Sequence, residues 1–209
     1  MPEIFDAIRS RVAAYYSAKI LEHGPIAKGV DWNDEAGQKL RFEVLSRLFG
    51  DVMRPSIAQL GCGYGAFVDY CDEQGREINY VGYDISSDMV ELARRRHAGR
   101  TNVRFELGAI PIAASEFCIA SGIFNVKFEI PVEDWRKYVF ATLDDMFEGS
   151  TRGFAFNCLT GLSDKHRMVD RLFYSDPGVM LDHCLGRYGR KATLVHDYRL
   201  FEFTVMVKK

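Results

Sequence analysis

The first fifty residues show a helical period of apolar and polar positions. Apolar residues recur every three or four positions from Ile4 to Ile20, which places them on one stripe of a helix. The Gly-Pro pair at residues 24–25 ends that helix. A second helix is predicted to begin at Asn33 or Asp34, either of which can serve as its N-cap. We therefore expect residues 1–54 to form an N-terminal helical cap.

After residue 55 the pattern changes to short apolar runs that alternate with helical segments, which favours a parallel sheet. The helix after the second run is predicted to have Ser86 or Ser87 as its N-cap, because serine is preferred there. Further helices are expected over Val132–Glu148 and around Pro177, a residue favoured in the first helical turn. The predicted strands are Ser56–Leu60, Tyr80–Asp84, Val103–Leu107, Phe117–Ser121 and Gly153–Cys158.

Two more strands are predicted close together near the end of the chain, over Ala192–His196 and Leu200–Val207. Only a few residues separate them, which is too few for the crossover that parallel neighbours need. They therefore pair antiparallel or belong to different sheets. The whole pattern predicts a single α/β domain over residues 1–209, with a mostly parallel sheet in residues 55–209.

Composition and charge argue against several classes of protein. The net charge is −2, whereas domains that grip nucleic-acid phosphates usually carry a net basic face. The N-terminus lacks the pattern of a secretory signal, and no run approaches the roughly 18 apolar residues of a membrane helix. The five cysteines are scattered without a CxxC pair, which argues against a metal site and favours a reducing compartment. We expect a cytoplasmic protein without nucleic-acid or membrane partners.

The strongest chemical signal is Gln-Leu-Gly-Cys-Gly-Tyr-Gly at residues 59–65, between an apolar strand and an apolar helix. The three glycines let the backbone turn tightly and approach a ligand closely. The helix that follows directs its free N–H groups toward the same place, where an anionic group can bind. The GxGxG spacing departs from the GxGxxG fingerprint of dinucleotide-binding proteins. The alternative is a tight strand-to-helix turn without a ligand.

Asp84 is the second chemical signal, since it ends the predicted second strand after the glycine-rich segment. A carboxylate at that position can accept hydrogen bonds from both hydroxyl groups of an adenosine ribose. The alternative is that Asp84 is the N-cap of the helix that starts near Ser87.

Together, residues 61–65, Asp84, the Gly108–Ile110 turn and the terminal hairpin resemble class I S-adenosylmethionine-dependent methyltransferases, of the type that acts on small molecules. The resemblance extends from about residue 56 to the C-terminus. It implies a Rossmann-like sheet of seven strands in which the last strand is antiparallel and lies beside the fifth. Five predicted parallel strands and the hairpin match that number. The resemblance implies S-adenosylmethionine as the cofactor.

The resemblance also implies positions for the cofactor-binding residues. The glycines at 61, 63 and 65 border the methionine part, Asp84 holds the ribose, Ile85 and Ile110 enclose the adenine, and residues 121–122 flank the reacting methyl group. Many family members have an acidic residue two positions before the first glycine, where this chain has Gln59, an amide without charge. The residues predicted to bind the cofactor are Gly61, Cys62, Gly63, Gly65, Asp84, Ile85, Met89, Ala109, Ile110, Ser121 and Gly122.

The segment after the predicted fourth strand is where substrate specificity is expected. It contains no NPPY-like tetrad, which argues against methylation of adenine N6 or glutamine, and no aspartate at the strand end, which argues against the metal-dependent catechol type. Asn125 and Lys127 could hydrogen-bond a polar substrate, or they could be solvated loop residues.

Candidates for a general base are few. His23 belongs to the N-terminal segment that forms a lid over the pocket in many such enzymes, and it is predicted to be catalytic together with Asn125. The same segment could instead be a helical cap with ordinary core aromatics. The residues predicted to contact the substrate are Tyr16, Lys19, Trp32, Lys127 and Tyr174.

We predict methyl transfer to an oxygen or nitrogen of a small polar metabolite. One alternative is a nicotinamide-dependent dehydrogenase, which would also use a glycine-rich loop and Asp84. The other is a catalytically inactive, methyltransferase-like binding protein. Apolar residues such as Ile4, Phe5 and Phe201 could serve either a homodimer interface or the core.

Overall fold

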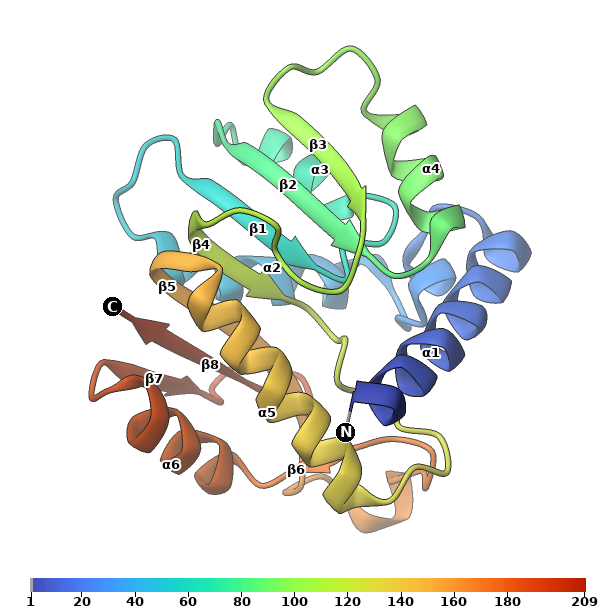
Figure 1. The fold of residues 1–209 in the computed structure, drawn as a ribbon, viewed down its shortest axis with the longest axis vertical. Coiled ribbons are helices and arrows are strands. Elements are labelled where there is room, and N and C mark those ends of the chain that lie inside the picture. Colours follow the sequence, from blue (N-terminus) through green and yellow to red (C-terminus); the bar gives the residue numbers. More distant parts are fainter. Residues whose placement is uncertain (1) are drawn as a thin grey trace.

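The computed structural model describes residues 2–209 of the chain, and the side chains of residues 4–209. Its main sheet has the order β3-β2-β1-β4-β5-β8-β7 (Figure 1), and a short β6 pairs with β5 off this path. Strands β1 to β5 are parallel, and β8 lies antiparallel between β5 and β7. The predicted seven-stranded sheet with a terminal antiparallel hairpin is confirmed. The strands are β1 Ser56–Leu60, β2 Asn79–Asp84, β3 Val103–Leu107, β4 Ser115–Ala120, β5 Ser150–Thr160, β6 Tyr174–Ser175, β7 Ala192–Val195 and β8 Glu202–Lys208.

Two of the α-helices begin at capping residues that the sequence indicates. Asp34 accepts a hydrogen bond from the Gly37 N–H at 2.6 Å, and Ser86 accepts one from the Met89 N–H at 3.3 Å. The α-helices are α1 Pro2–His23, α2 Glu35–Ser46, α3 Ala66–Glu73, α4 Ser87–Arg96, α5 Val132–Glu148 and α6 Pro177–Tyr188. The short 3-10 helices are η1 Ala27–Val30, η2 Arg47–Phe49 and η3 Lys165–Arg167.

Helices cover both faces of the sheet, which explains why its strands are apolar runs without strict alternation. Helices α5 and α6 lie over one face, and α2 and α3 lie over the other (Figure 1). The first core cluster joins α1, α5 and α6 to the sheet and contains Trp135, Phe154 and Phe156. The second cluster contains Phe42 from α2 and Phe67 from α3. Helix α2 therefore packs as part of the core.

The last strand begins later than predicted. The prediction placed Leu200 and Phe201 in it, whereas β8 begins at Glu202. The Leu200 N–H donates to the Tyr198 carbonyl at 2.7 Å, so these residues form a tight turn instead of continuing the ladder with β7. Within residues 2–209, no helix is both long enough and apolar enough to cross a membrane.

Candidate active site

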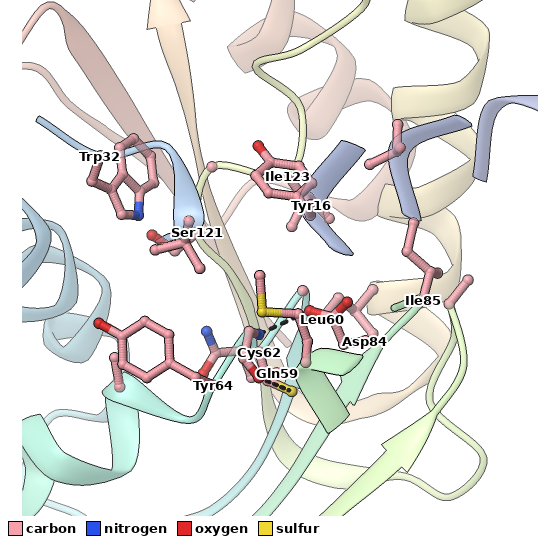
Figure 2. Close-up of a pocket in the computed structure, with 18 of the residues that line it drawn as sticks. Tyr16, Trp32, Gln59, Leu60, Cys62, Tyr64, Asp84, Ile85, Ser121 and Ile123 are labelled. Atoms are coloured by element: carbon pink, nitrogen blue, oxygen red, sulfur yellow. Dashed lines mark hydrogen bonds between the residues drawn. The ribbon is translucent and has the colours of Figure 1, made fainter. Parts of the chain in front are cut away.

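A pocket lies at the carboxyl ends of β1, β2 and β4 (Figure 2). It is lined by the glycine loop at residues 61–64, by residues 84–85 after β2 and by residues 121–123 after β4. Trp32, from the segment between η1 and α2, also lines it. Figure 2 shows Trp32 and Tyr64 on one side of the pocket and residues 84–85 on the other. This is the edge of an open α/β sheet where ligands are expected.

Glycine is required at two points of the pocket wall. Gly61 and Gly122 have φ of 64° and 74°, in the left-handed region that favours glycine. A methyl group added at Gly61 would overlap the Ile123 side chain, and one added at Gly122 would overlap the indole ring of Trp32. The glycine backbone is therefore packed directly against side chains that line the pocket.

Asp84 joins the glycine loop to the end of β2. One carboxylate oxygen accepts a hydrogen bond from the Gly63 N–H at 2.8 Å, and the other accepts one from the Ser86 N–H at 2.9 Å. Burial raises the pKa of Asp84 above its ordinary value, while these backbone donors act in the opposite direction. Ser86 is the N-cap of α4, so that role does not fall to Asp84. Each carboxylate oxygen keeps a further lone pair for a ligand.

Two glutamines line the pocket, and tyrosine hydroxyl groups hold their amides in place. The Gln59 amide oxygen accepts a hydrogen bond from the Tyr80 hydroxyl at 2.7 Å. The Gln38 amide oxygen accepts one from the Tyr64 hydroxyl at 3.2 Å. Both glutamines are buried. Their orientation is therefore set before any ligand binds.

A buried polar network supports the wall at Gly122. The Arg41 Nε donates to both carboxylate oxygens of Glu202, at 3.0 and 2.9 Å. Asn157 donates to Glu202 at 2.7 Å and accepts a hydrogen bond from the Gly122 N–H at 2.7 Å. The Arg41 guanidinium also stacks on the Trp32 ring, 3.8 Å from its centroid. The network thus connects α2, β5 and β8 to two residues that line the pocket.

The structure brings most of the predicted cofactor and substrate residues together around this pocket. Two predicted cofactor-binding residues lie outside its lining. Gly65 is the N-cap of α3 and lies against His97, whose Nε2 would be 2.7 Å from a Cβ at that position. Ile110 is 46% exposed. The predicted residues that line the pocket are Tyr16, Trp32, Gly61, Cys62, Gly63, Asp84, Ile85, Met89, Ala109, Ser121 and Gly122.

The two residues predicted to be catalytic lie outside the pocket lining. His23 is in the last turn of α1, where its Nε2 is 3.6 Å from the Glu22 carboxylate. Asn125 is buried in the loop after β4, and its carbonyl accepts a hydrogen bond from the Phe173 N–H at 2.8 Å. This backbone bond ties the loop to the segment before β6.

Three residues predicted to contact the substrate also lie outside the lining. The Lys19 ammonium is 3.4 Å from the Asp31 carboxylate. Lys127 donates to the carbonyl of the next residue at 3.1 Å, and the Tyr174 hydroxyl accepts a hydrogen bond from the Val169 N–H at 3.1 Å. Each of these polar groups has a partner within the protein.

Several lining residues were not predicted. Tyr64 could have been found, because it lies inside the glycine-rich motif. Gln38 comes from α2, and Tyr138 and Thr142 come from α5. No local pattern marks those three residues, which reach the pocket only through the packing of their helices.

The pocket offers few groups that can exchange a proton near neutral pH. Among the described residues that line it there is no histidine, lysine or arginine. Burial raises the pKa of the Cys62 thiol and of the phenols of Tyr16, Tyr64 and Tyr138, so these groups are protonated at neutral pH. Asp84 is the acidic residue of the lining, and backbone donors occupy both of its oxygens.

The order of the sheet and the glycine loop opposite a buried aspartate are those of a Rossmann-like methyltransferase domain. A family model described as a methyltransferase domain matches residues 57–142. Rv1506c of Mycobacterium tuberculosis, a protein named as a methyltransferase, is 45% identical over 154 residues, which are 74% of this chain and 93% of that protein. The chain belongs to the class I S-adenosylmethionine-dependent methyltransferases.

Two further comparisons show a local sequence similarity and a shared fold. A fatty-acid O-methyltransferase of Mycolicibacterium smegmatis is 30% identical over 79 residues, which are 37% of this chain and 28% of that protein. The solved structure of a DhpI–SAH complex has a TM-score of 0.65 at 16% identity, and the match covers 96% of this chain and 97% of that one. The predicted S-adenosylmethionine-dependent methyltransferase is thereby confirmed, and the alternative of a nicotinamide-dependent dehydrogenase is wrong.

Proposed function

We propose that this methyltransferase transfers a methyl group to an oxygen or nitrogen of a small polar metabolite, and that the acceptor atom is nucleophilic at neutral pH without first losing a proton. A carboxylate oxygen or a neutral amine nitrogen meets that condition. The observation that carries the proposal is the composition of the pocket lining: among the described residues it holds no histidine, lysine or arginine, and the Asp84 carboxylate already accepts hydrogen bonds from two backbone N–H groups. Bound S-adenosylmethionine supplies an electrophilic methyl group.

The protein then accelerates the transfer mainly by positioning the acceptor against the methyl group, and less by acid–base chemistry. We propose that Asp84 holds the ribose hydroxyl groups with its free lone pairs, and that Ile85 contacts the adenine. Gly61 and Gly63 leave room for the methionine part. Aromatic side chains from the N-terminal segment would enclose the acceptor, in agreement with the place of Tyr16 in the lining. The Mycolicibacterium smegmatis relative is named as a fatty-acid O-methyltransferase, which supports a carboxylate oxygen as the acceptor atom.

Asp84→Asn tests the cofactor part of this proposal. We expect it to weaken binding of S-adenosylhomocysteine about tenfold, or about 1.4 kcal/mol, because an amide retains one oxygen acceptor instead of two. Burial raises the pKa of Asp84, so the wild-type carboxyl protonates above its ordinary pH range. Wild-type affinity should therefore fall as the pH falls toward that range, and the Asp84→Asn variant should lack this dependence. Titration calorimetry from about pH 7.5 to about pH 5 measures both effects, and equal affinities throughout would rule out the role.

A panel of matched acceptors tests the transfer itself. Carboxylic acids and weakly basic amines that are neutral at pH 7, such as aromatic amines, should be methylated, whereas the alcohols of the same carbon skeletons should not be, as measured by release of S-adenosylhomocysteine. His23→Ala should then keep the wild-type rate and pH profile. A large loss of rate in that variant would support His23 as a base and contradict the proposal. Tight cofactor binding without methylation of any acceptor class would favour the inactive binding protein.

A further inference from the structure

At residue 59 this chain has a glutamine amide, where many family members have a carboxylate. Gln59 lies two residues before Gly61 and lines the pocket. Its amide oxygen is occupied by the hydroxyl of the buried Tyr80, at 2.7 Å. The amide nitrogen is therefore the part of Gln59 that is available to a ligand. A side chain that would accept hydrogen bonds in other members of the family is a donor here.

Two more donors line the same pocket. The oxygen of Gln38 is occupied by Tyr64 at 3.2 Å, which leaves its amide nitrogen available as well. Figure 2 shows the indole nitrogen of Trp32 on the ring edge turned toward the interior of the pocket. Stacking on Arg41 holds this ring in place. Within residues 2–209, none of these three nitrogens donates to a side chain or to the backbone.

Carboxylates, by contrast, are scarce among the described lining residues. Asp84 is the carboxylate among the described lining residues, and it is engaged by the N–H groups of Gly63 and Ser86. Three donors without protein acceptors suit a bound carboxylate, whose two oxygens accept several hydrogen bonds. They do not suit an ammonium group, which itself only donates.

We propose that the donors of Gln59, Gln38 and Trp32 form the subsite for the carboxylate of the methionine part of S-adenosylmethionine. The inference rests on the proposed placement of the cofactor in this pocket. With this subsite the protein recognises its cofactor by the carboxylate of the methionine part. It does not use an acidic residue that pairs with the ammonium group. A cofactor analogue without that carboxylate binds more weakly.

Gln59→Glu distinguishes recognition of the cofactor's carboxylate from recognition of its ammonium group. The substitution places a carboxylate where the family often has one, so recognition of the ammonium would make binding tighter. Recognition of the carboxylate makes it weaker, because two negative groups then face each other. We expect S-adenosylmethionine to bind this variant about tenfold more weakly, and decarboxylated S-adenosylmethionine to bind it at least as well as it binds wild type. Titration calorimetry at neutral pH measures both ligands.

Gln38→Leu is the second variant, since it removes one donor while keeping a side chain of similar size. It should weaken binding of S-adenosylmethionine about tenfold and leave the decarboxylated ligand unchanged. Gln74→Glu, at an exposed position after α3, is the matched control and should change neither affinity. Thermal unfolding of each variant confirms the fold.

The outcomes distinguish the inference from the proposed function. No binding of either ligand to wild-type protein would overturn the placement of the cofactor. Binding of both ligands to wild type with equal affinity would overturn the carboxylate subsite alone. Unchanged or tighter binding of S-adenosylmethionine to the Gln59→Glu variant would overturn it too.

Discussion

Replacing Glu202 by alanine is expected to lower the free energy of unfolding by about 3–5 kcal/mol, because it leaves a buried charge without its partner. Glu202 is 1% exposed and holds both the guanidinium of Arg41 and the amide of Asn157. Removal of the carboxylate leaves these donors buried and unsatisfied. Urea-induced unfolding at neutral pH, followed by circular dichroism, measures the change.

Glu43→Ala is the matched control for this prediction. Glu43 is on the exposed side of α2, where its carboxylate lies 3.8 Å from Arg47 and both side chains are largely in solvent. Surface pairs of this kind contribute about 0–1 kcal/mol. A loss of less than about 1 kcal/mol for Glu202→Ala would mean that water reaches the Arg41 guanidinium, and that the network does not support the wall at Gly122.

Gly61→Ala is expected to reduce the affinity for S-adenosylmethionine by on the order of 100-fold, or about 2.7 kcal/mol. The new methyl group would overlap Cγ2 of Ile123, and a β-branched side chain has little rotameric freedom with which to move away. The loop or Ile123 must then shift, and both line the pocket. Titration calorimetry with S-adenosylmethionine measures the loss.

Gly75→Ala separates backbone strain from the effect on the pocket. Gly75 has a φ of 63°, almost the same as the 64° of Gly61, but a Cβ there meets no atom within 4 Å. Both substitutions place alanine in the left-handed region at a cost of about 1–2 kcal/mol. Only the Gly61 variant should lose affinity for the cofactor. Equal affinities of the two variants would show that the close packing at Gly61 is unrelated to binding.

The parts of this protein that could be predicted from sequence are those carried by contiguous residues. The glycine loop and Asp84 lie at the ends of short apolar strands, so the alternation of strands and helices places them at one edge of the sheet. The short separation between the last two strands indicated a hairpin. The two-residue β6 was too short to leave a pattern in the sequence.

The remaining parts depend on contacts between distant segments. Arg41 and Glu202 are 161 positions apart, and neither lies in a motif that indicates the other. Gln38 reaches the pocket only because α2 packs against the sheet. The period of α1 indicates which of its residues share a stripe, but not which neighbour that stripe meets. The position of His23 beside Glu22, outside the pocket lining, therefore could not be read from the period.

The position of Trp32 has a practical consequence for spectroscopy. The chain has two tryptophans. Trp135 is fully buried in the core and donates its indole N–H to the Phe124 carbonyl at 2.9 Å, whereas Trp32 lines the pocket. Changes in intrinsic fluorescence on ligand binding thus report on Trp32 against a constant background. A Trp135→Phe variant would leave Trp32 as a single fluorophore, through which cofactor arrival and departure could be followed in real time without a label.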